Sequence, residues 1–332
     1  MTDIRLSVLD QSVSLAGSTE DAAIRDTLDL AQHAERLGYS RFWVSEHHGL
    51  PTIIGSAPEM LMAAIAARTT RIRIGSAGVM LPHYSALKVA EQFRVLEALA
   101  PGRIDLGVGR APGGDMRTAR ALNPNAHAAA DDFPEQVRDL QAWTALPSHQ
   151  GITAHPLGPY APEVWILGSS NYGAQLAAHF GLPYAFAYFF VDGQGAEEAL
   201  AIYRRLYQPS KRHTTPQPTV CVWALGAYTF EEACHHALGR ERWRVDRARG
   251  VLGPLQSPDV IAARGFTADE WPTVDAMRGK AFVGTAAQVG AQLRALASEL
   301  QLDELVVNTW AHDPAARRTS YALLAQEFGL KA

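Results

Sequence analysis

The sequence predicts an α/β fold of the (β/α)8 TIM-barrel type, with rim insertions between its regular elements. Short β-branched and aromatic runs alternate along the 332 residues with longer runs of helical period, which is typical of parallel βαβ units. Eight strands can be counted, whereas open doubly wound sheets more often have five or six. Because such barrels form large single domains, we expect one domain over residues 1–332.

In the first half of the chain, apolar runs mark the strands, and apolar residues spaced three or four apart mark the helices. Gly38 can end the first helix, and Pro101-Gly102 predicts the turn before the fourth strand. The expected strands are 6–9, 41–45, 72–81 and 104–108, and the expected helices are 22–37, 59–67, 86–99 and 133–143.

The second half continues the alternation, and Gly181-Leu182-Pro183 predicts the end of one of its helices. The expected strands are 164–167, 184–190, 219–225 and 304–308, and the expected helices are 172–180, 196–207, 230–238, 287–300 and 315–328. The aromatic run 184–190 is interpreted as barrel core and part of an apolar pocket wall.

Four irregular stretches account for the length beyond a bare barrel of roughly 250 residues. They are residues 111–130, 145–163, 208–218 and 239–280. The last stretch is charged and contains Pro254, Pro258 and Pro272. We expect it to be an insertion above the barrel, after the seventh strand.

Composition excludes several classes of protein. Apolar residues make up 47% and charged residues 19%, with a net charge of −4, so a disordered chain or a nucleic-acid-binding surface is not expected. No apolar run approaches the roughly 18 residues of a membrane span, and Met1–Arg5 does not resemble a signal peptide. The two cysteines, Cys221 and Cys234, are too few for a disulfide framework, so a reduced, cytoplasmic protein is expected.

The carboxyl ends of the strands carry the candidate chemistry, because barrel active sites lie at that face. Glu46-His47-His48 follows the second strand, and His47 is an acid–base candidate because histidine titrates near neutrality. These histidines could also be solvated or structural, and no metal site is expected. A glycosidase-like pair of Asp10 and Glu46 stays open as an alternative.

Two strand ends indicate an anion site. Ser169 and Ser170 precede a helix, whose free N–H groups favour phosphate, and Arg110 after the fourth strand can supply charge. The alternatives are helix capping by a serine and a surface ion pair at Arg110. The glycine-rich segment 107–114 departs from a dinucleotide fingerprint and follows the wrong strand, so we interpret it as a flexible rim loop.

These strand ends, in this order, resemble the bacterial luciferase-like flavin monooxygenases, within them the group most like the luciferase α chain. The matching segments are Leu9–Ser12, Ala34–Tyr39, Trp43–His48, Arg71–Pro82, Lys88–Phe93, Pro101–Arg110 and Trp165–Ser170. The resemblance implies a TIM barrel that binds FMN at its C-terminal face. It also implies that a separate flavin reductase supplies the reduced FMN, and that O2 then forms a flavin C4a-peroxide that oxygenates a small organic substrate. Such relatives are commonly dimers, so a homodimer is expected.

The resemblance assigns roles by position. His47 matches the active-site histidine, and Ala77-Gly78 matches a non-proline cis peptide beside the flavin ring. Five further residues match positions that hold the FMN phosphate: Arg110, Ser169, Ser170, Tyr172 and Gly173. Ser169 stands where the luciferase α chain has glutamate, and Val108 where luciferase has a reactive cysteine.

Three alternative functions are weighed against this one. The first is hydride transfer with the deazaflavin F420 on the same barrel. The second is a non-catalytic flavin-binding subunit, which the retained set of His47, Ala77-Gly78 and Arg110 disfavours. The third is a nicotinamide dehydrogenase, which is disfavoured because no glycine fingerprint follows the first strand. The sequence does not indicate which substrate is oxygenated.

Overall fold

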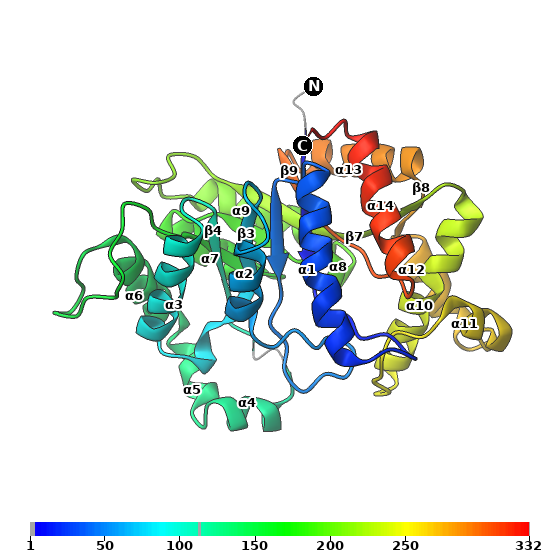
Figure 1. The fold of residues 1–332 in the computed structure, drawn as a ribbon, viewed down its shortest axis with the longest axis horizontal. Helices are drawn as coiled ribbons and strands as arrows, with labels where there is room; N and C mark the ends of the chain where they lie inside the picture. Colours follow the sequence, from blue (N-terminus) through cyan, green and yellow to red (C-terminus); the bar gives the residue numbers. More distant parts are fainter. Residues whose placement is uncertain (1–3, 112–113, 332) are drawn as a thin grey trace.

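The computed structural model describes residues 4–111 and 114–331, and it contains a closed barrel of eight parallel strands (Figure 1). Around the ring the order is β1–β2–β3–β4–β5–β6–β7–β9, and β9 pairs with β1 to close it. The bounds are β1 Arg5–Asp10, β2 Arg41–Val44, β3 Arg73–Met80, β4 Ile104–Gly109, β5 Glu163–Gly168, β6 Tyr184–Phe186, β7 Pro218–Ala227 and β9 Glu304–Asn308. The expected (β/α)8 fold is confirmed.

Helices surround the barrel and cover its apolar outer face (Figure 1). Their bounds are α1 Glu20–Arg36, α2 Pro58–Ala66, α3 Ala86–Leu99, α4 Met116–Leu122, α5 Ala126–Asp131, α6 Phe133–Ala145, α7 Asn171–Phe180, α8 Tyr188–Val191, α9 Ala196–Leu206, α10 Phe230–Ala248, α11 Pro258–Arg264, α12 Trp271–Arg278, α13 Ala286–Glu299 and α14 Pro314–Glu327, with a short 3₁₀ turn at Leu81–His83. The large core cluster between barrel and helices explains their apolar stripes.

The strand expected over 184–190 is shorter in the structure. β6 ends at Phe186, and α8 begins two residues later. Phe189 packs against both the cluster inside the barrel and the cluster beneath α10. A helical turn places this side chain between two layers, which an extended strand in the barrel wall would not do, so the prediction for the second half of this segment is wrong.

The segment 239–280 is more regular than expected. The helix expected over 230–238 continues to Ala248, and α11 and α12 follow it. A ninth strand, β8 (Phe282–Thr285), pairs with Ala224–Ala227 of β7 and was not anticipated. Charged residues hide the apolar period of α10, and β8 is only four residues long, so neither pattern is visible locally.

One of the other irregular stretches, 111–130, also contains regular structure. Asp115 caps α4 by accepting a hydrogen bond from the Thr118 N–H at 2.7 Å. α5 follows at Ala126, so the stretch 111–130 is largely helical. The flexible loop expected after the fourth strand includes Pro112 and Gly113, which lie outside the described residues.

The amino end of the barrel is filled by a buried network of charges. Arg41 donates to Asp105 and Glu304 at 2.9 Å each and to Glu163 at 3.2 Å. These residues come from β2, β4, β5 and β9, so one guanidinium connects four strands. Because this end is filled by charge pairs, a ligand has access to the barrel only from the carboxyl end.

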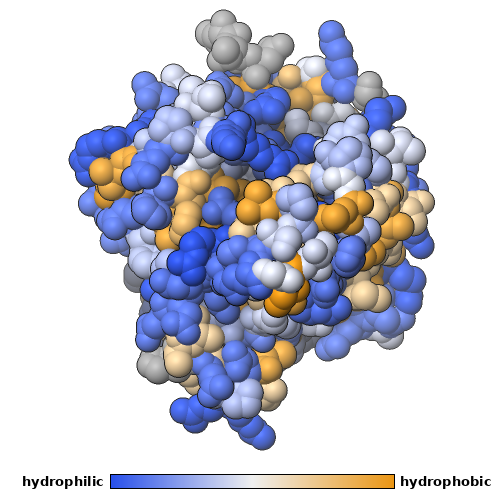
Figure 2. Space-filling view, turned by 90° about the vertical axis from the view of Figure 1, so that its left-hand side faces the viewer, coloured by the Kyte–Doolittle hydropathy of each residue, from blue (hydrophilic) through white to orange (hydrophobic). Residues whose placement is uncertain are grey.

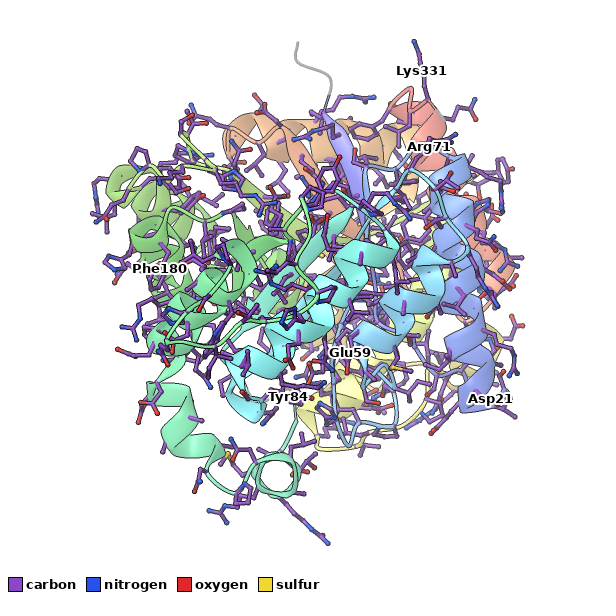
Figure 3. The ribbon with its side chains drawn as sticks, turned by 60° about the vertical axis from the view of Figure 1, so that its left-hand side comes forward. Asp21, Glu59, Arg71, Tyr84, Phe180 and Lys331 are labelled. Atoms are coloured by element: carbon purple, nitrogen blue, oxygen red, sulfur yellow. The ribbon has the colours of Figure 1, made fainter. Side chains whose placement is uncertain are left out.

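The two ends of the barrel differ in what surrounds them. In Figure 1 both termini lie at the top, while α4 and α5 project at the bottom. Figure 3 shows Arg71, which precedes β3, near the end with the termini, and Tyr84, which follows β3, near the end with α4 and α5. The strand carboxyl ends therefore point toward the rim helices. On the side shown in Figure 2, hydrophilic residues separate several small apolar patches.

Candidate functional site

The end of β3 contains the peptide bond that the resemblance singles out. The peptide bond between Ala77 and Gly78 is a cis bond that does not involve proline. The pairing of β3 with β4 shifts register between Ser76 and Val79, around this bond. A Cβ on Gly78 would lie 2.4 Å from Leu167 Cδ1 and 2.7 Å from the Gly107 carbonyl oxygen. Only glycine fits there, because the backbones of β3 and β4 approach very closely at this point.

Ala77 packs against an apolar cluster inside the barrel. This cluster contains Leu9, Trp43, Trp165, Ala185, Cys221 and Val306. Trp43 and Trp165 meet edge to face, with ring centroids 5.1 Å apart. Cys221 is buried here, as its place in a strand predicts. The cluster forms an apolar floor beneath the strand ends.

His47 lies just beyond β2 and is partly buried. Its Nδ1 lies 3.1 Å from the Ser45 hydroxyl. The pKa of His47 is lowered from 6.5 to about 4, chiefly by loss of solvation; Glu46 opposes this shift, and the charges of His48 and of Arg247 on α10 add to it. The ring is therefore neutral at pH 7, which corrects the expectation that it titrates near neutrality.

Glu46 is buried beside His47 and has three partners. Its carboxylate accepts hydrogen bonds from the Met80 N–H at 3.0 Å, the Tyr84 hydroxyl at 2.7 Å and the His48 ring at 2.7 Å. Glu46 thus joins the end of β2 to the last residue of β3, Met80, and to Tyr84 beyond it. Sequence reasoning missed this role, since only the fold brings Met80 and Tyr84 to this carboxylate.

The pairing of Asp10 and Glu46 as glycosidase carboxylates is not supported by their contacts. Asp10 accepts from Arg317 at 2.8 Å and from the Thr27 hydroxyl at 2.5 Å, and both its ion-pair partner and its strand are buried. Glu46 is equally occupied. A general acid needs a proton that it can give to a substrate, and both carboxylates are instead held by internal donors.

Arg110 and the start of α7 are brought together. The Arg110 guanidinium stacks over the Tyr172 ring, 4.2 Å from its centroid. Within residues 4–111 and 114–331, Arg110 has no hydrogen bond or ion pair. Ser170 is the N-cap residue of α7, but its side chain makes no capping hydrogen bond. Both simpler alternatives, capping by Ser170 and an ion pair at Arg110, are therefore absent from the described structure.

The remaining residues of the expected phosphate site surround this helix end. Ser169 is partly buried, Ser170 is exposed, and Gly173 is buried in the first turn. A Cβ on Gly173 would lie 3.3 Å from the Tyr184 ring, so the turn rests tightly on this tyrosine. The first N–H groups of a helix have no partner within it. Free N–H groups, two hydroxyls and an unpaired guanidinium form an arrangement that can accept a phosphate.

Other candidate features lie apart from these residues. A cavity of about 550 Å³ lies between α10 and the segment 251–260 and is lined by none of the expected site residues. In the described part of the chain, no group of three or more metal-ligating side chains is assembled. Among those same residues, no helix is long and apolar enough to cross a membrane.

Comparison with known proteins places the chain in a family. The family model for luciferase-like monooxygenases matches residues 4–303. The chain is 42% identical over 331 residues to the Bacillus subtilis protein YwcH, covering 98% of this chain and 99% of that one. It is 36% identical to N-acetyl-S-alkylcysteine monooxygenase of the same organism, with 97% of each chain covered.

Solved structures agree on the fold. The structure of apo-MsnO8 has a TM-score of 0.92 at 36% identity and covers 99% of each chain. Two more distant structures share the fold. One is the oxygenating component of 3,6-diketocamphane monooxygenase from Pseudomonas putida, solved with FMN, with 18% identity and a TM-score of 0.72. The other is an F420-dependent secondary alcohol dehydrogenase, with 13% identity and a TM-score of 0.67. At that identity only the barrel is shared, so these two do not distinguish between the cofactors. From its sequence match and its barrel, the chain belongs to the luciferase-like monooxygenase family.

Proposed function

We propose that the protein is an FMN-dependent monooxygenase that uses reduced FMN and O2 to oxygenate a small organic substrate. The observation that carries this proposal is the unpaired Arg110 beside the uncapped start of α7. These features lie at the carboxyl ends of β4 and β5, beside that of β3, where a barrel places its ligand.

The residues on these strand ends fit the parts of FMN. The phosphate would be held by Arg110, the hydroxyls of Ser169 and Ser170 and the N–H groups at Tyr172 and Gly173. The flat ring would lie by Ala77 and Gly78, where no side chain projects from position 78 and the floor is apolar. When bound in its reduced form, the flavin supplies the electrons with which O2 is activated.

His47 is assigned the catalytic role in this proposal. Because its pKa is about 4, the ring is neutral at physiological pH and carries one proton. Among the described residues, Nε2 of His47 has no hydrogen-bond partner, while Nδ1 is close to the Ser45 hydroxyl. A ring whose Nδ1 accepts from Ser45 holds its proton on Nε2, where it can donate to a reacting oxygen.

Several accompanying features are part of the proposal. A separate reductase supplies reduced FMN, and the enzyme acts in the cytoplasm as a single-domain protein. Exposed Met60 on α2 and Val95 and Leu99 on α3 give a homodimer an apolar contact surface. Gel filtration that gives a monomer at working concentration would contradict the dimer. The relative that acts on N-acetyl-S-alkylcysteine makes thioethers the first substrate class to screen.

The cofactor proposal is tested by anaerobic titration. The protein is titrated with reduced FMN and, in parallel, with reduced F420, and each mixture then receives a pulse of O2. We expect tight binding of reduced FMN and a transient change in its absorbance after the pulse, with F420 at least tenfold weaker. Preference for F420 together with unchanged absorbance after the pulse would support the hydride-transfer alternative. The absence of binding by either cofactor would overturn both.

A further inference from the structure

One face of α10 carries three arginines and a tryptophan at helical spacing. Arg240, Trp243, Arg244 and Arg247 are separated by three or four residues and therefore share a side of the helix. Trp243 packs edge to face on Trp310, with centroids 4.7 Å apart. This contact belongs to the apolar cluster that covers the carboxyl ends of β7 and β9. The arginine face is thus directed at the open end of the barrel.

The three arginines differ in their partners. Arg244 forms a two-pronged ion pair with Asp192, with both N–O distances 2.6 Å. Arg240 lies over the Trp223 ring at 4.2 Å and donates to the Phe189 carbonyl at 3.4 Å. Burial, with the charge of Arg244, lowers the pKa of Arg240 to about 9. Asp192 is thus the only carboxylate that the described structure pairs with this face.

Arg247 is the arginine whose charge is least compensated. Its guanidinium lies 5.2 Å from the centroid of Trp243 and 5.5 Å from that of Phe190, and in the described ranges it has no hydrogen bond or ion pair. Burial and the charge of Arg244 lower its pKa. Exposed arginines are commonly solvated, but this exposed guanidinium also lies over two aromatic rings.

Nearby carboxylates on other sides of α10 and at the start of α12 are paired with other arginines. Asp246 and Glu270 are bound by Arg242, at 2.8 Å and 2.7 Å. Glu241 is bound by Arg278 at 2.7 Å. The face therefore presents three cations against one bound carboxylate, which leaves an excess charge of two. An excess of this kind in a partly desolvated place attracts an anion.

The position of this face relative to the proposed chemistry follows from Phe189. This side chain packs against the barrel-floor cluster that Ala77 also touches, and against the cluster beneath α10. Its carbonyl accepts the hydrogen bond from Arg240, and the charge of Arg247 contributes to the lowered pKa of His47. The arginine face is therefore connected to the floor through Phe189, while Arg110 comes from β4 and stacks on the start of α7.

We propose that Arg247 binds the carboxylate of an organic acid, and that Phe190 and Trp243 contact the apolar part of the same molecule. This assigns apolar carboxylic acids as the substrate class and rests on the proposed function. Arg247 is a specificity residue here, because it holds the end of the substrate that does not react.

The proposal is tested by binding, without turnover. The probe is 4-phenylbutyrate, compared with its neutral amide, and binding is measured by calorimetry in the presence and absence of FMN. The variants are Arg247→Gln, which removes the charge, and Arg247→Lys, which keeps it. Arg25→Gln, on the exposed surface of α1, removes the same charge at a distance. Circular dichroism and FMN affinity are recorded for every variant.

We expect the wild type to bind the acid at least tenfold more tightly than the amide. Arg247→Gln should abolish that preference, Arg247→Lys should retain part of it, and Arg25→Gln should leave it unchanged. FMN affinity should change less than twofold in all variants. Equal affinity of the wild type for acid and amide, or an equal loss of both in Arg247→Gln, would overturn the proposal. Failure of the wild type to bind FMN would instead contradict the proposed function.

Discussion

His47 shows how surroundings change the chemistry of a single residue. Free histidine titrates near neutrality, whereas here loss of solvation and a nearby arginine hold the pKa at about 4. Desolvation favours the neutral form of an imidazole. The side chain can therefore present a proton at pH 7 without carrying a positive charge.

The same shift predicts how stability depends on pH. Between pH 6.5 and 4 the unfolded chain binds a proton at His47 and the folded chain does not, so stability falls as pH decreases through this interval. Between pH 7.5 and 5, we expect the free energy of unfolding to fall less in His47→Gln than in the wild type, and the difference should be at most about 2 kcal/mol. Urea unfolding at the two pH values measures this difference.

His179→Gln is the matched control, since His179 is exposed on α7. Its loss of stability between the two pH values should equal that of the wild type. If His47→Gln instead loses as much stability between the two pH values as the wild type does, the low pKa of His47 is wrong, whatever the role of the residue in turnover.

Arg110 gives a prediction for cofactor binding. Its guanidinium stacks on Tyr172 and has no carboxylate partner among the described residues, so Arg110→Gln removes charge without exposing a buried carboxylate. A charge-assisted hydrogen bond contributes about 1.5–3 kcal/mol, so we expect the Kd for FMN to rise about tenfold or more. Fluorescence titration measures it. Arg117→Gln, an exposed change on α4, should leave the Kd within a factor of two.

At the scale of elements, α10 is held in place by buried charge pairs. The Arg242 guanidinium donates twice to the Glu270 carboxylate, at 2.9 Å and 2.7 Å, and Arg249 contacts the same carboxylate. Arg242 and Glu270 are both almost inaccessible to solvent. The pair connects α10 to the start of α12, so it sets where the arginine face lies.

We predict that Glu270→Gln loosens this region and leaves the barrel unchanged. Removing one partner of a buried pair costs about 3–5 kcal/mol, and here Arg242 keeps only Asp246 as its counterion. Hydrogen exchange should accelerate at least tenfold in α11 and α12 and remain unaltered in the barrel strands. Asp269→Asn, at an exposed position paired with Arg249, should have little effect. Protection equal to the wild type in α12 would show that the pair does not anchor this helix.

Acid should act on this pair as the substitution does. Hydrogen bonds from Arg242, and from the Thr267 N–H, lower the pKa of Glu270 from 4.5 to about 2. The stabilisation is complete above pH 4.5 and is lost as pH falls toward 2. As the pH is lowered through this interval, the hydrogen-exchange protection of α12 should therefore decrease at a higher pH than that of the barrel strands.

At the scale of the whole molecule, the network around Arg41 connects strands on opposite sides of the ring. Arg41→Leu would leave Asp105 with Arg73 alone and Glu304 with only the half-exposed Arg5, so we expect a loss of about 3–5 kcal/mol in the free energy of unfolding. Arg5→Leu removes a half-exposed partner of Glu304 and should cost less than about 1 kcal/mol. Urea denaturation compares the two, and equal losses would contradict a special role for Arg41.

The sequence by itself determined the eight barrel strands, the order of the helices and the strand ends at which the site lies. These features depend on local patterns. A parallel strand that is buried on both faces needs a continuous apolar run, and a helix that packs on the barrel needs apolar residues three or four positions apart. The resemblance likewise placed a cis peptide at Ala77–Gly78, which the structure contains. The roles expected for His47 and for the phosphate-binding residues remain predictions.

Only the tertiary structure decided what each strand end contacts. Two of the three partners of Glu46, Met80 and Tyr84, come from a segment more than 30 positions along the chain. The low pKa of His47 depends chiefly on burial, with a contribution from a charge 200 positions along the chain. The end of β6, the added β8 and the length of α10 were also settled there. A short strand, a helical turn between two layers and a helix rich in paired charges are stabilised by distant partners, so no local pattern in the sequence records them.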